Sequence, residues 1–84
     1  MTPELDVVVL TEPVVEHALE KGDVGTVVHV FRQSEAYEVE FVTWKGTTAA
    51  LVTLKPSQFR PVERRDLLHV RDWPGANSPK ALAA

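Results

Sequence analysis

The chain has 84 residues, enough for one domain, and its longest apolar run is far shorter than the ~20 residues of a membrane span. The absence of cysteine excludes disulfides and thiolate metal sites and favours a reducing, cytoplasmic setting. The net charge of −3 is uneven, because residues 1–54 hold nine acids and three bases while residues 55–84 hold three acids and six bases. The acidic part argues against non-specific nucleic-acid binding, and the basic part is a candidate contact surface.

Residues 5–11 are the first predicted strand, since they are rich in β-branched side chains and a proline follows that cannot donate to a ladder. Residues 14–21 fit either one loose helical turn or a long loop. Gly22 and Asp23 form the next turn, in which glycine adopts a positive φ, and we attribute Gly25 to turn geometry as well.

The second and third predicted strands, residues 24–32 and 36–43, are joined by a short hairpin loop. The third strand alternates apolar and acidic side chains, which is typical of an antiparallel strand with one buried face and one wet face. The buried face is predicted to hold Tyr37, Val39 and Phe41, and the wet face Glu38 and Glu40.

A turn at residues 44–47 leads to the fourth predicted strand, residues 48–54. A single 3₁₀ turn follows at residues 55–59, because proline presets φ at its start, and Phe59 is expected to plug one end of the barrel. Residues 60–62 are a short fifth strand whose proline suits a sheet edge.

The C-terminal part is less regular. Residues 67–70 fit either a sixth strand or a docked extension, and residues 74–84 have no periodicity and are predicted to be a disordered tail. We expect Trp44 and Trp73 to cap the open end of the barrel, where they would add apolar area to a small core. The alternative is that they are interface hot spots, in which aromatic residues are enriched.

These elements predict an all-β fold, a small SH3-like antiparallel barrel of five to six strands with a 3₁₀ turn before the last strand. The barrel is assigned to residues 1–73 and the disordered tail to residues 74–84. An OB-fold is the competing architecture, but it needs a helix between the third and fourth strands, and no segment here supplies one.

Four segments together resemble a family of small bacterial proteins known as domain of unknown function 4926. They are residues 5–10, 21–28, 37–41 and 54–62, and the resemblance extends over roughly residues 5–71. The turn at residues 22–25 is also similar to turns in the β-subunit barrel of nitrile hydratases and in ribosome-associated KOW motifs. Because the family has no assigned activity, the resemblance implies a barrel and no catalytic residue.

No constellation of residues indicates catalysis. Glu38 and Glu40, about 7 Å apart on one strand face, are interpreted as a solvated face because no insertion forms a cleft over them. The three histidines, His17, His29 and His69, lie in separate segments without metal-ligand spacing. We therefore predict that the protein is not an enzyme and uses no cofactor and no metal.

The densest basic segment is the predicted interaction surface, and aromatic residues flank it. Its residues are Lys55, Phe59, Arg60, Arg64, Arg65, His69, Arg71 and Trp73. The leading hypothesis is a protein-interaction module, an accessory, antitoxin-like or immunity-like partner of another bacterial protein. The partner is another protein or a second copy, the homodimer burying Leu67, Leu68, Val70 and Trp73.

The alternative hypothesis is a KOW-like barrel that binds nucleic acid. Lys55, Arg60, Arg64 and Arg65 would pair with phosphates, and neighbouring aromatic rings would stack on bases. The acidic residues interleaved with these cations favour a protein partner instead. No membrane partner is expected.

The end of the chain, Ala81-Leu82-Ala83-Ala84, resembles the C-terminus of the bacterial tag that Clp-type AAA+ proteases read. Leu82, Ala83 and Ala84 are accordingly a candidate degradation signal, which suits a short-lived regulatory partner better than an enzyme. An Ala-rich tail without consequence is the competing interpretation.

Overall fold

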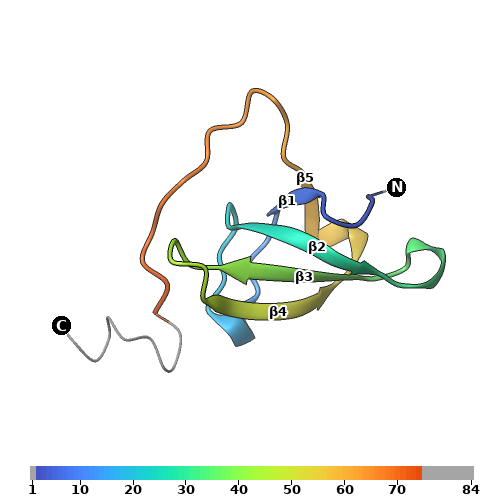
Figure 1. The fold of residues 1–84 in the computed structure, drawn as a ribbon, viewed down its shortest axis with the longest axis horizontal. Helices are drawn as coiled ribbons and strands as arrows, with labels where there is room; N and C mark the ends of the chain where they lie inside the picture. The colour runs from blue at the N-terminus through green and yellow to red at the C-terminus, as the bar shows by residue number, and fades with distance from the viewer. Residues whose placement is uncertain (1, 75–84) are drawn as a thin grey trace.

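The computed structural model describes residues 2–74, which form one five-stranded antiparallel sheet with three 3₁₀ turns and, within that range, no α-helix (Figure 1). The strands are β1 (Val7–Leu10), β2 (Val24–Val30), β3 (Tyr37–Val42), β4 (Thr48–Leu54) and β5 (Phe59–Pro61). The 3₁₀ turns are η1 (Val15–His17), η2 (Arg32–Ser34) and η3 (Pro56–Gln58). The five predicted strands and the turn before the last strand are confirmed, with ends that shift by one or two residues.

The strand order in the sheet is β4-β3-β2-β1-β5. Strands β1 to β4 form a meander, and the chain then returns through η3 so that β5 pairs with β1, with Leu10 opposite Phe59. Strands β4 and β5 are the two edges of the sheet. The proline of β5 therefore lies on an edge strand, as the sequence predicts.

The core lies on the concave side of the sheet, because alternate side chains of each strand point inwards. In β3, Tyr37, Val39 and Phe41 are buried while Glu38 and Glu40 lie on the outer face, so the predicted alternation is confirmed. The buried apolar residues are Val8, Leu10, Val14, Leu19, Val27, Tyr37, Val39, Phe41, Ala50, Val52, Leu54 and Phe59.

Phe59 is confirmed as a buried plug. Its ring meets the ring of Tyr37 edge to face, with centroids 5.1 Å apart, which is a favourable aromatic geometry.

Gly25 is not a turn residue, which corrects the interpretation from sequence. It lies inside β2, and a Cβ atom there would come within 2.7 Å of Cγ1 of Val39 and 2.9 Å of Cε2 of Phe41. Because Gly25 has no side chain, the side chains of Val39 and Phe41 can pack directly against the backbone of β2.

The segment left open at residues 14–21 contains the turn η1, with Ala18 in the left-handed region at φ 55°. Val14 and Leu19 pair across this turn, and both side chains are buried in the core. The loop between β1 and β2 is therefore part of the folded body.

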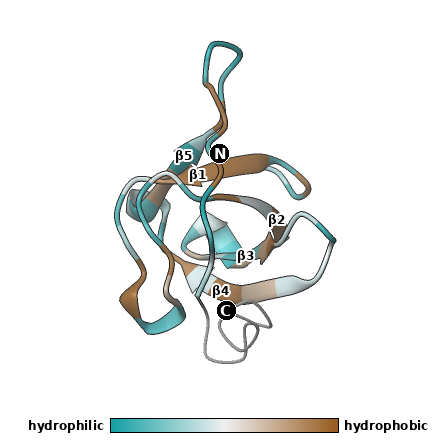
Figure 2. Cartoon of the chain, turned by 90° about the vertical axis from the view of Figure 1, so that its left-hand side faces the viewer, coloured by the Kyte–Doolittle hydropathy of each residue, from teal (hydrophilic) through white to brown (hydrophobic). Residues whose placement is uncertain are grey.

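After β5 the chain makes a projecting turn and then crosses the β1–β2 loop as an extended segment, which we call the strap (residues 62–74). Figure 2 shows the projecting turn as a hydrophilic tip on a hydrophobic base, with the rest of the strap descending over this side of the molecule. The strap contains no strand, so the five-stranded alternative holds. Within the described chain, the backbone of residues 67–74 makes no backbone hydrogen bond.

Candidate interaction surface

The far end of the strap is fixed by an ion pair between Arg71 and Asp23, the residue just before β2. Nε of Arg71 donates to Oδ1 of Asp23 at 2.8 Å, and Nη2 donates to Oδ2 at 2.6 Å, which is a bidentate geometry. Nη2 also donates to the backbone oxygen of Ala18 at 2.8 Å. One guanidinium therefore ties the strap to both ends of the turn at residues 18–23.

The carboxylate of Asp23 lies at the centre of these contacts, and the residue is only 9% exposed. Burial by itself raises the pKa of Asp23, but hydrogen bonds from Arg71, the backbone N–H of Glu20 and His69 outweigh burial and lower that pKa below its ordinary 3.8. Nε2 of His69 lies 3.1 Å from Oδ1 of Asp23. The hydrogen bond to Asp23 raises the pKa of Arg71, so both groups are charged at neutral pH. We call Asp23, His69 and Arg71 the clamp.

Gly22 explains how the strap comes so close to the loop. Its φ of +98° is in the region that glycine favours, as predicted, and a Cβ atom there would lie 3.3 Å from Cε1 of His69. A further contact comes from Trp73, whose Nε1 donates to the backbone oxygen of His17 at 3.0 Å while its ring packs against the core.

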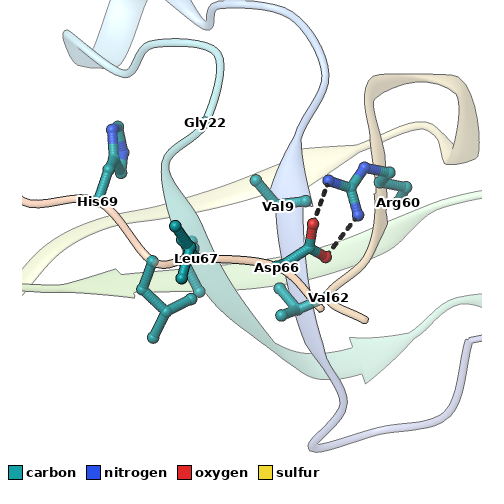
Figure 3. Close-up of a pocket in the computed structure, with 9 residues that line it drawn as sticks. Val9, Gly22, Arg60, Val62, Asp66, Leu67 and His69 are labelled. Atoms are coloured by element: carbon teal, nitrogen blue, oxygen red, sulfur yellow. Dashed lines mark hydrogen bonds and ion pairs between the residues drawn. The ribbon is translucent and has the colours of Figure 1, made fainter. Parts of the chain in front are cut away.

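The near end of the strap is fixed by a second bidentate pair (Figure 3). Nη1 and Nη2 of Arg60 donate to the two carboxylate oxygens of Asp66 at 2.8 and 3.0 Å. The hydrogen bonds from Arg60 and from the backbone N–H of Glu63 lower the pKa of Asp66 to about 2. Between this pair and the clamp lies a pocket of about 220 Å³, with Val9 and Leu67 among its lining residues.

A larger groove of about 1450 Å³ separates the strap from the β3–β4 turn. The exposed large apolar side chains that line it come from the β1–β2 loop, the end of β3, the β3–β4 turn and the strap. They are Val15, Val42, Trp44, Leu68 and Val70. Trp44 and Val70 are 100% and 98% exposed, so this apolar surface has no cover within residues 2–74.

Trp44 does not cover the end of the core, which corrects the expectation from sequence. It lies in the tight turn beyond the last β3–β4 pair, Val42 and Thr48, so its ring projects past the end of the sheet. Trp73 does pack against the core, as predicted.

The residues of the predicted interaction surface fall into three groups. Lys55, Arg64 and Arg65 are exposed and form no ion pair within residues 2–74. Arg60, His69, Arg71 and Trp73 are occupied by the contacts that fix the strap. Phe59 lies in the core, because it begins β5 with its ring on the inner face of the sheet. Leu82, Ala83 and Ala84 lie outside the described residues.

Sequence reasoning missed the role of Asp23. Asp23 was interpreted as an ordinary turn residue, although it binds two strap residues that are 46 and 48 positions away. The only signal was weak: Asp23 is the acidic residue between two glycines, and acidic residues nearer to Arg71 in the sequence offered it closer partners.

Two further observations concern other classes of site. In the part of the chain that the structure describes, no three His, Asp or Glu side chains gather where a metal ion could bind. No helix in residues 2–74 has the length and the apolar character that crossing a membrane requires.

The geometry thus defines a small all-β domain with a strap fastened across one loop and an apolar groove beside it. A family model described as Domain of unknown function (DUF4926) matches residues 4–61, more than half of the chain, and the chain belongs to that family. The match ends with β5, so the strap lies beyond the matched residues. Comparison with curated proteins gave no match, and comparison with solved structures gave none.

Proposed function

We propose that the protein is a non-enzymatic interaction module that binds another bacterial protein through the groove between the strap and the β3–β4 turn. The observation that carries this proposal is the exposure of Trp44 and Val70 on facing sides of one groove. Tryptophan is the residue type most often found at interface hot spots. Covering exposed apolar side chains removes them from water, so a partner that fills the groove gains binding free energy.

An SH3-like barrel is the fold that we propose for this module. The strand order β4-β3-β2-β1-β5 and the single 3₁₀ turn between β4 and β5 support it. The antitoxin-like or immunity-like role and the cytoplasmic location belong to the same proposal, and the absence of cysteine supports the location.

The alternative, a nucleic-acid-binding barrel, has weaker support. Arg60 and Arg71 already pair with Asp66 and Asp23, so two cations that would contact phosphates are neutralised within the chain. Lys55, Arg64 and Arg65 are the cations that would serve this function.

The test compares tagged wild-type protein with Trp44→Ser/Val70→Ser in a pull-down from the source organism, with and without nuclease. We expect one stoichiometric, nuclease-resistant partner that the double variant loses. The matched control is Leu5→Ser, because Leu5 is 77% exposed and does not line the groove. Equal recovery by the wild type and the double variant would reject the groove, and recovery that nuclease abolishes would favour nucleic acid.

A further inference from the structure

The two edge strands of the sheet differ in how they are protected from pairing with another chain. Strand β5 has three residues, and two of them are Arg60 and Pro61. A short strand, a charge and a proline are devices by which proteins block an exposed edge. Strand β4, at the opposite edge (Figure 1), has seven residues and contains no charged residue, no proline and no glycine. The β4 edge therefore lacks the protection that the β5 edge has.

The backbone of β4 has hydrogen-bonding groups that the sheet does not use. Strand β4 has β3 as its neighbour on one side and no strand on the other. Alternate residues of such an edge strand point their N–H and C=O groups away from the sheet. Within residues 2–74, no backbone group of β4 forms a hydrogen bond outside the β3–β4 ladder. The free side of β4 is therefore a template to which one more strand can add.

The regular part of this edge is the run Ala50–Leu54. It pairs in unbroken register with Tyr37–Phe41, after an irregularity near the start of β4. Its side chains alternate between buried residues and the outer residues Leu51 and Thr53, and Leu51 is 51% exposed. None of the five residues lines the groove beside the strap, so this edge is a separate surface.

We infer that the protein forms a two-fold homodimer in which β4 of one copy adds antiparallel to β4 of the other and joins the two sheets. The two-fold axis passes at Val52, so Leu51 of each copy lies opposite Thr53 of the other. Directly opposite residues of an antiparallel pair share one face and pack against each other. The contact is self-complementary, because both copies contribute the same strand.

The charges near this edge are compatible with a second copy. The nearest acidic side chains on the outer face, Glu38 and Glu40, lie on β3, and β4 itself carries no charge. In the joined sheet the two β3 strands are three strand spacings apart, about 14 Å. That separation exceeds the Debye length of about 8 Å at physiological ionic strength, so repulsion between the two sets of carboxylates is weak.

A second copy is also favoured over an extended segment of another protein. Strand β4 of the second copy is already ordered by its own ladder with β3, so little backbone entropy is lost when it pairs. An extended peptide would have to be ordered on binding. The inference rests on the proposed function, an interaction module, and gives that module a second copy as one partner. It places the dimer contact on β4, whereas the homodimer expected from sequence places it on the strap.

The first test is sedimentation equilibrium at physiological ionic strength on the wild type and on Leu51→Lys/Thr53→Lys. In the proposed register the lysines of the two copies lie directly opposite each other, and charge on an edge strand opposes pairing. We expect a dimeric wild type and a dimer weakened about tenfold or more in the variant. The matched control is Leu5→Lys/Val7→Lys, which adds the same charge at positions that are 77% and 43% exposed, and it should leave the dimer unchanged.

The second test measures the register by cross-linking, which is clean because the chain has no cysteine. Directly opposite Cα atoms are about 4.5–5.5 Å apart, within the range that a disulfide bridges. Mixing Leu51→Cys with Thr53→Cys under oxidising conditions should therefore give the mixed disulfide, identified by its mass. Each variant alone should cross-link less, since the same residue of the two copies lies on a diagonal about 7–8 Å apart.

Each result decides the inference. A wild type that stays monomeric at every concentration overturns it, and so does a dimer that a folded Leu51→Lys/Thr53→Lys variant does not weaken. A mixed disulfide no more abundant than the like disulfides also overturns it. If circular dichroism shows the lysine variant unfolded, the cysteine mixture decides. A monomeric wild type that still recovers a partner lost by Trp44→Ser/Val70→Ser would reject the dimer and keep the proposed function.

Discussion

The sheet body and the strap are held by different forces. The body (residues 7–61) is held by backbone ladders and a continuous apolar core, with Val8, Val27 and Val39 fully buried. The strap has no backbone ladder of its own beyond Asp66 and is held by the Arg60–Asp66 pair, the clamp and Trp73. The stabilisation of the body is spread over many apolar contacts, whereas the strap depends on a few directional hydrogen bonds and ion pairs.

The two regions should therefore separate when the protein is destabilised. Segments with few buried apolar contacts open at lower free energy than the core of the same protein. The family match ends where the body ends, at Pro61, which agrees with a body that folds by itself.

The largest effect should come from Leu54→Ala, which removes a side chain that is only 1% exposed. We expect the free energy of unfolding to fall by about 2–5 kcal/mol, because the cavity adds to the lost burial. Chemical denaturation of the dilute protein measures this. Leu51→Ala on the same strand is the control, and a similar loss there would show that the inner and outer faces are wrongly assigned.

Gly25→Ala should be next, since the added methyl group meets Val39 and Phe41 inside 3 Å. Overpacking of this kind costs about 1–3 kcal/mol, again measured by denaturation. At Gly46 a Cβ atom would meet nothing within 4 Å, but φ is +89°, so Gly46→Asn keeps backbone strain without a clash and should cost less than Gly25→Ala. Equal effects at the two positions would contradict the close β2–β3 contact.

Arg71→Ala should release the strap and leave the body folded. The variant loses the guanidinium contacts to Asp23 and Ala18, and we expect a cost of about 1–3 kcal/mol that is confined to strap docking. In a Trp44→Phe background, Trp73 is the remaining tryptophan, so its fluorescence reports strap docking. Its emission maximum should shift to the red, while the denaturant midpoint of the main unfolding transition should not change. Arg64→Ala is the control and should leave the emission maximum unchanged. A strap that stays docked in Arg71→Ala would contradict the prediction and show that the Trp73 contacts alone hold the strap.

Acid should release the strap in the same way. The pKa of Asp23 is lower in the folded chain than its ordinary 3.8, so the folded state binds fewer protons and is favoured above that value. Docking should be unchanged between pH 7 and about pH 5, and it should weaken as the pH falls through 3.8 and below. Trp73 emission in the Trp44→Phe background measures strap docking as a function of pH. Release of the strap above pH 5 would show that a histidine, and not Asp23, controls docking.

The smallest effect on stability should come from Trp44→Ser. The side chain is fully exposed, so the free energy of unfolding should change by no more than about 0.5 kcal/mol. The change that we expect is in partner recovery, as described for the groove. A large loss of stability would show that the indole packs on the chain.

The body was largely predictable from sequence, because its signals are local. Alternation in β3 and the proline that opens η3 each act over a few residues, and the strands follow from them. Gly25 was misinterpreted because its constraint comes from Val39, which is distant in sequence. The clamp was missed for the same reason, since an ion pair across 48 positions leaves no period for a sequence to reveal.

The clamp also sets an effective concentration. Since β5 already anchors the strap, fastening Arg71 to Asp23 closes a loop of only about ten residues, whose closure entropy is small. A free arginine or a competing ion in solution must therefore outcompete a tethered group present at an effective concentration of about millimolar. A partner that binds the strap residues directly would open the strap more effectively than free ions at millimolar concentration.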